Sequence, residues 1–173
     1  MFWNEELRRH LFQRVDDGAL THAVMLAGPP GMGKRALATQ LLGRFLGVSL
    51  DASAESPAHQ HPDLHVVRPE EDKRQIAVDQ IRGLTAALAL SAHGNQGKAA
   101  LIEPADSMTT AAANSLLKTL EEPTADSLLV LVVDSRGRLP ATIVSRTTRY
   151  QTHPPARSAA VAWLAEQGLS EED

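Results

Sequence analysis

The stretch Gly28-Pro29-Pro30-Gly31-Met32-Gly33-Lys34-Arg35 decides the fold predicted for this sequence, because it follows the pattern G-x-x-x-x-G-K. A short apolar run at 23–27 precedes it, and Leu37, Leu41 and Leu42 follow at helical spacing. A strand that enters a glycine-rich loop and leaves as a helix is the setting in which backbone N–H groups surround phosphates. The stretch therefore predicts a P-loop between a buried strand and a helix.

Strand-sized and helix-sized segments alternate along the rest of the chain. Further strands are predicted at 64–68, 99–103, 128–133 and 147–150, and the helices at 78–90, 109–121 and 157–167. Because strands separated by helices form parallel sheets with both faces covered, we expect an α/β fold with a parallel five-stranded sheet. The segment 128–133 is the most apolar and is predicted to be central.

Composition excludes several classes of protein. The chain has 173 residues, 43% of them hydrophobic, a net charge of −4 and no cysteine. The absence of cysteine rules out disulfides and thiolate zinc sites, and no apolar run is long enough to span a membrane. A domain that binds nucleic acid over a broad face is usually basic, so the charge argues against autonomous DNA binding. We expect a cytoplasmic protein.

The residues that would complete an ATPase site are replaced. Arg35 stands where the motif has a Ser or Thr hydroxyl for Mg²⁺, and a guanidinium has no lone pair to offer a cation. At the end of the third predicted strand, Glu103 and Pro104 stand where an Asp-Glu pair would hold metal and activate water. Asp106 is predicted to cap the following helix. The sequence therefore predicts a site that does not hydrolyse ATP in cis.

Residues 114–123, which read NSLLKTLEEP, resemble the signature helix of bacterial clamp-loader subunits. The lead-in at 19–23, the run His61-Pro62-Asp63 and the segments 76–82 and 139–146 are similar to the same family, so the resemblance covers most of 20–146. It implies an AAA+ domain. With a degenerate site and a retained Ser145-Arg146 pair, the chain resembles the non-hydrolysing members of the DNA polymerase III clamp loader.

The resemblance also implies roles for particular residues. Gly28, Gly31, Gly33, Lys34 and Arg35 correspond to a degenerate P-loop, Glu103 to a degenerate acidic motif, and Arg146 with Ser145 to an arginine finger offered to a neighbour's ATP. The implied process is DNA replication. The implied partners are the gamma/tau ATPase subunits and delta, and through the complex the sliding clamp and primer-template DNA. No cofactor is required, and any ATP or ADP binding is expected to be weak.

The resemblance sets the expected domain organisation. The AAA+ domain is predicted at 1–153 and the start of a lid domain at 154–173, as in the N-terminal part of a longer protein. The family usually carries a four-cysteine zinc module after the P-loop helix, and this chain has no cysteine, so no structural metal is assumed. Glu121 and Glu122 are predicted to end an exposed helix.

Three alternatives remain at this stage. One is a slow ATPase or nucleotide kinase that uses Lys34 with Glu103, and another is a module that binds ATP or ADP without turnover. The third is a metal site formed by the segment with His59, His61, Asp63 and His65. Surface histidines are the preferred interpretation of that segment, because it is a predicted loop containing a proline.

Overall fold

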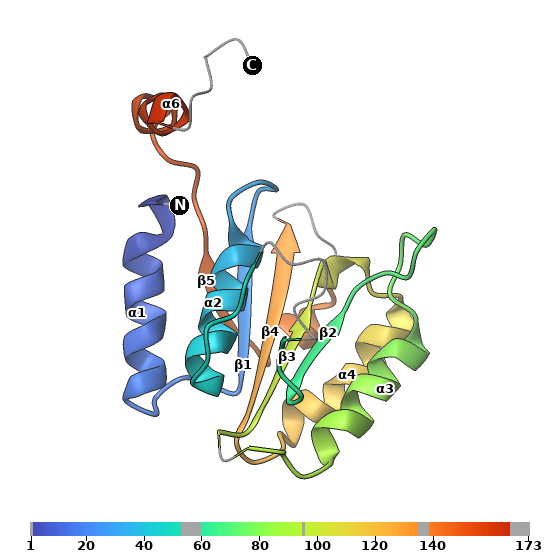
Figure 1. Cartoon of the computed structure of the whole chain (residues 1–173). Coiled ribbons are helices and arrows are strands. Elements are labelled where there is room, and N and C mark those ends of the chain that lie inside the picture. Colours follow the sequence, from blue (N-terminus) through green and yellow to red (C-terminus); the bar gives the residue numbers. More distant parts are fainter. Residues whose placement is uncertain (1, 53–59, 95, 135–138, 167–173) are drawn as a thin grey trace.

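A five-stranded parallel sheet forms the centre of the domain, as predicted (Figure 1). The computed structural model describes residues 2–52, 60–94, 96–134 and 139–166. The strands lie in the order β2-β3-β4-β1-β5. Their bounds are β1 Ala23–Gly28, β2 Leu64–Val67, β3 Lys98–Ile102, β4 Ser127–Asp134 and β5 Thr148–Gln151. The apolar segment predicted to be central is β4, which is confirmed.

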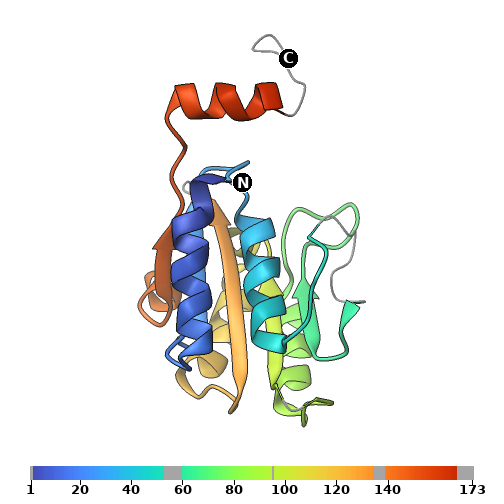
Figure 2. The same ribbon diagram turned by 60° about the vertical axis from the view of Figure 1, so that its left-hand side comes forward.

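Helices cover both faces of the sheet (Figures 1 and 2). The helices α1 and α2 pack on one face, whereas α3 and α4 pack on the other with the short α5. Their bounds are α1 Glu5–Asp16, α2 Lys34–Leu46, α3 Val78–Ala89, α4 Thr110–Glu121, α5 Ala141–Val144 and α6 Arg157–Glu166, with 3-10 turns η1 Phe2–Asn4 and η3 Ala105–Ser107.

Alternation along the strands produces two separate hydrophobic cores. In β4, Leu129, Leu131 and Val133 point into the core against α3 and α4, and the intervening apolar residues point into the core against α1 and α2. Both faces of β4 are therefore buried, which explains why its sequence is continuously apolar rather than alternating. The same division holds in β1 and β3.

The start of α4 corrects one prediction. Asp106 was expected to cap this helix, but Thr109 is its N-cap, and the Thr109 hydroxyl accepts a hydrogen bond from the Ala112 N–H at 3.2 Å. Asp106 lies in η3, and the extended backbone of Met108 separates it from α4. Its Oδ1 instead accepts from the Asp134 N–H at 3.3 Å. Asp106 therefore links η3 to the end of β4.

The last described helix, α6, lies beyond the carboxyl ends of the strands, close to the N-terminus (Figures 1 and 2). The ring of Trp163 in α6 meets the ring of Trp3 in η1 edge-on, with centroids 5.3 Å apart and planes at 80°. Such T-shaped pairs contribute about 0.5–1.5 kcal/mol beyond area burial. Gln167, predicted to end this helix, lies outside the described residues, and the division at 153/154 stays a prediction.

Candidate functional site

The glycine-rich loop occupies the turn between β1 and α2, where the sequence placed it. Gly33 precedes α2 with φ 73°, a left-handed conformation that favours glycine. Gly28 ends β1 against Thr152, and a Cβ at position 28 would lie 2.0 Å from the Thr152 hydroxyl oxygen. The close approach of Thr152 therefore requires glycine at position 28, and the left-handed backbone favours glycine at position 33.

Lys34 is directed back into its own loop. Its Nζ donates to the carbonyl oxygens of Gly28 and Pro29 at 2.7 Å each, and to Oδ1 of Asp134 at 2.9 Å. The side chain is only 4% exposed, whereas that of Asp134 is 37% exposed. An ammonium group has three N–H donors, so these contacts satisfy it fully. The lysine that would meet phosphates thus ties the loop to the end of β4.

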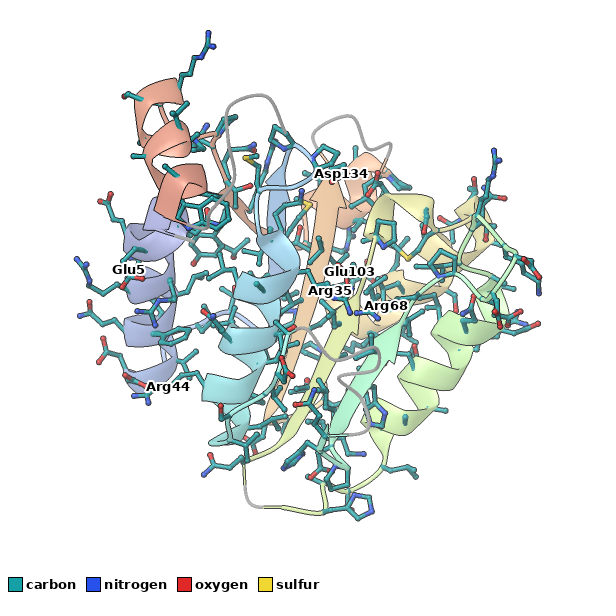
Figure 3. The ribbon with its side chains drawn as sticks, turned by 45° about the horizontal axis from the view of Figure 1, so that its top comes forward. Glu5, Arg35, Arg44, Arg68, Glu103 and Asp134 are labelled. Atoms are coloured by element: carbon teal, nitrogen blue, oxygen red, sulfur yellow. The ribbon has the colours of Figure 1, made fainter. Side chains whose placement is uncertain are left out.

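Glu103 lies between two arginines. Its Oε2 accepts from Nη2 of Arg68 at 3.0 Å, and Nε of Arg35 lies 3.7 Å from the same oxygen (Figure 3). The Glu103 side chain is 16% exposed, so these charges compensate one another in a largely buried position. Arg35 therefore meets the acid that could have held a metal. Pro104, which follows Glu103, has no side-chain acceptor.

A cavity of about 470 Å³ lies beside the loop. Its lining includes loop residues 30–35, Glu103 and Asp134, so most of the predicted P-loop and the acidic motif converge on one space. In the same loop, the Met32 carbonyl oxygen accepts hydrogen bonds from Trp3 Nε1 at 3.2 Å and Asn4 Nδ2 at 2.6 Å. The N-terminal segment thus holds the loop, and Trp3 connects it to α6.

Arg146 lies at the opposite end of the sheet from the P-loop. It precedes β5, whose Thr148 pairs with Val24 near the start of β1, whereas the P-loop follows the last residue of β1. Four residue steps of about 3.3 Å, from Val24 to Gly28 along β1, separate the two levels by about 13 Å. Arg146 is therefore placed away from the chain's own glycine-rich loop.

The guanidinium of Arg146 has several fixed partners. Its Nε and Nη2 lie 2.9 and 2.6 Å from Oε1 of Glu121, and Nη1 donates to the Thr142 carbonyl oxygen at 3.0 Å. Nη1 also contacts the hydroxyl of Ser145 at 3.3 Å. The Arg146 side chain remains 35% exposed. Sequence reasoning treated Glu121 only as the end of a helix and missed this contact.

The histidine-rich segment is organised around Asp63. This buried carboxylate accepts hydrogen bonds from the His93 N–H at 2.8 Å, the His93 ring at 3.0 Å and the Gly94 N–H at 3.0 Å. Burial opposes its ionisation, but these hydrogen bonds outweigh burial and lower the Asp63 pKa to about 2.

The other histidines of the segment have separate surroundings. Burial lowers the pKa of His65, and the His61 ring accepts from the Asp63 N–H at 3.2 Å. His59 lies outside the described residues. Within the described ranges, no three His, Asp or Glu side chains are grouped to hold a metal ion. Nor is any helix in the described ranges both long and apolar enough to cross a membrane.

The fold defines an AAA+ α/β domain. A DNA polymerase III gamma subunit-related protein from Thermotoga maritima superposes with a TM-score of 0.70 at 23% identity, covering 96% of this chain and 54% of that one. The Thermotoga maritima RuvB Holliday junction branch migration motor superposes with a TM-score of 0.56 at 20% identity, covering 87% and 43%. At these identities the likeness concerns the fold alone.

Sequence comparison defines the family. The family described as DNA polymerase III, delta subunit matches residues 3–156. The DNA polymerase III subunit delta' of Pseudomonas aeruginosa is 38% identical over 172 aligned residues, which cover 94% of this chain and 52% of the relative. The chain belongs to this DNA polymerase III delta subunit family, and it spans about half the length of the curated relatives that it matches.

Proposed function

We propose that this chain is the AAA+ part of a clamp-loader subunit that does not hydrolyse ATP and that supplies Arg146 to the ATP of a neighbouring subunit. The observation that carries the proposal is the position of Arg146. It is partly exposed and lies at the end of the sheet away from its own P-loop. A guanidinium in this position is suited to a phosphate on another molecule, since it is planar, permanently charged and still partly exposed.

The state of the chain's own loop supports the same proposal. The donors of Lys34 are engaged within the loop and by Asp134, and Arg35 and Arg68 compensate Glu103. Without a hydroxyl for Mg²⁺ and an acid for water, phosphoryl transfer loses its main sources of acceleration. We therefore propose gamma/tau ATPase subunits and delta as partners, with the sliding clamp and primer-template DNA engaged through the complex.

A second candidate function is nucleotide binding without turnover. The cavity of about 470 Å³ beside the loop favours it, because Gly31, Gly33 and Lys34 line that space. Bound phosphates would have to compete with Asp134 and two loop carbonyls for the lysine. Any such binding is therefore weak in this proposal, and no cofactor is required.

The experiment uses the full-length protein assembled with its ATPase partners. Arg146→Ala is expected to lower clamp- and DNA-stimulated ATP turnover while assembly persists, and Arg146→Lys to recover little, because Lys lacks the bidentate geometry. The loss is expected to be partial, since other sites in the complex have fingers of their own. Arg149→Ala is the matched control, because Arg149 is an exposed β5 arginine that contacts Gln151. Wild-type turnover with Arg146→Ala would refute the proposed trans role.

A further inference from the structure

Glu121, the last residue of α4, holds one edge of the Arg146 guanidinium. Its Oε1 lies 2.9 Å from Nε and 2.6 Å from Nη2 of Arg146. The Nη1 group is held by the Thr142 carbonyl oxygen at 3.0 Å. Glu121 of α4 and Thr142 of α5 therefore fix the plane of the guanidinium together. The fold brings these two partners to the same arginine, although they are distant in sequence.

The backbone that carries Glu121 is itself anchored. Leu120 is 3% exposed, and its carbonyl oxygen lies 3.0 Å from Nε2 of His22, in the segment that leads into β1. Thr119 contacts Thr85 of α3 at 3.2 Å, and Pro123 follows the helix. An arginine side chain has many accessible rotamers, so a fixed carboxylate narrows the range of positions that the guanidinium samples.

Helix stability does not account for the acid at this position. A negative charge at the C-terminus of a helix opposes the helix dipole, so Glu121 is unfavourable for α4 considered alone. The Glu121 and Arg146 side chains are 50% and 35% exposed, and an ion pair this exposed contributes little to stability. The main effect of the ion pair is therefore the orientation that it gives to Arg146, and not the stability that it adds.

We infer that Glu121 is a positioning residue, which holds Arg146 in the orientation that reaches the neighbouring subunit's ATP. This inference rests on the trans role proposed for Arg146. The segment EEP in the signature helix would thereby have a physical role: its first glutamate sets the geometry of the finger.

The test measures stimulated ATP turnover by the complex assembled from full-length protein and its ATPase partners. Glu121→Gln, which keeps the side-chain shape but removes the charge, is expected to lower kcat about two- to fivefold with KM unchanged. Glu121→Asp is expected to recover part of the loss. Glu122→Gln is the matched control, because Glu122 is the adjacent exposed acid at the same helix end and is expected to leave turnover unchanged.

A double-mutant comparison separates positioning from a general structural effect. If Glu121 acts through Arg146, adding Glu121→Gln to Arg146→Ala lowers turnover no further. An additional loss in that background overturns the inference, as does an unchanged or raised rate with Glu121→Gln alone while Arg146→Ala reduces it. A wild-type rate with Arg146→Ala refutes the proposed function as well. Size-exclusion chromatography confirms that each variant assembles.

Discussion

Replacing Lys34 with methionine tests whether this lysine is a structural tie rather than a phosphate ligand. Methionine keeps the apolar stem but removes the ammonium group, which donates to two loop carbonyls and to Asp134. In a loop open for phosphate, loss of the lysine would have little effect on the stability of the empty protein. In this structure, it leaves the Gly28 and Pro29 carbonyls without their donor.

The magnitude follows from burial. Removing one partner of a buried ion pair costs about 3–5 kcal/mol, because the remaining charge is uncompensated. Asp134 is 37% exposed, so water solvates part of its charge and the expected cost falls to about 2–3 kcal/mol. In a chain of 173 residues, each kcal/mol corresponds to about 2–4 °C in melting temperature. We therefore expect Lys34→Met to lower Tm by about 4–12 °C.

Thermal and urea denaturation of the 173-residue chain, followed by circular dichroism, would measure this change. Lys118→Met is the matched control, because Lys118 is exposed on α4 and the same substitution there is expected to change stability by less than about 0.5 kcal/mol. If Lys34→Met is as stable as the control, Lys34 does not tie the loop, and the account of an internally satisfied loop is wrong.

Three further results are expected. Arg35→Thr restores a hydroxyl but no water-activating acid, so the purified chain should still show no ATP turnover; measurable turnover that requires Mg²⁺ would contradict this. Asp63 has a pKa lowered to about 2, so its stabilising contribution is complete above about pH 4 and disappears as the pH falls through 2. Asp63→Asn should therefore reduce the dependence of the free energy of unfolding on pH in that range. If this dependence were unaltered, the result would argue against the His93 contacts. Thr109→Ala should cost about 1 kcal/mol through loss of the α4 cap, whereas an equal cost for Thr110→Ala would refute that assignment.

The sequence predicted the fold well because its strongest signals are local. The apolar run that became β4 needed only its own composition to be placed at the centre, since both faces of a central parallel strand are buried. The context of the glycine-rich loop was equally local, because strand, loop and helix are consecutive. Arg35 and Pro104 were interpreted from the chemistry of their side chains, which does not depend on the fold.

Contacts between residues that are distant in sequence could not be predicted in the same way. Glu121 and Arg146 are 25 residues apart, and Asp63 and the His93 ring 30 apart, so no periodicity links them. The prediction of the α4 cap was wrong for a different reason. Asp106 and Thr109 are both good cap residues, and only the 3-10 turn between β3 and α4 decides which one adopts the extended backbone before the helix.

The central claim is that the chain acts on a neighbour's ATP and not on its own. The most direct measurement is the single-turnover rate of ATP hydrolysis by the assembled complex, with Lys34→Met or Arg146→Ala introduced into this subunit. The temperature must lie below the melting points of both variants. The account predicts an unchanged rate with Lys34→Met and a reduced rate with Arg146→Ala. A reduced rate with Lys34→Met, together with an unchanged rate with Arg146→Ala, would contradict it.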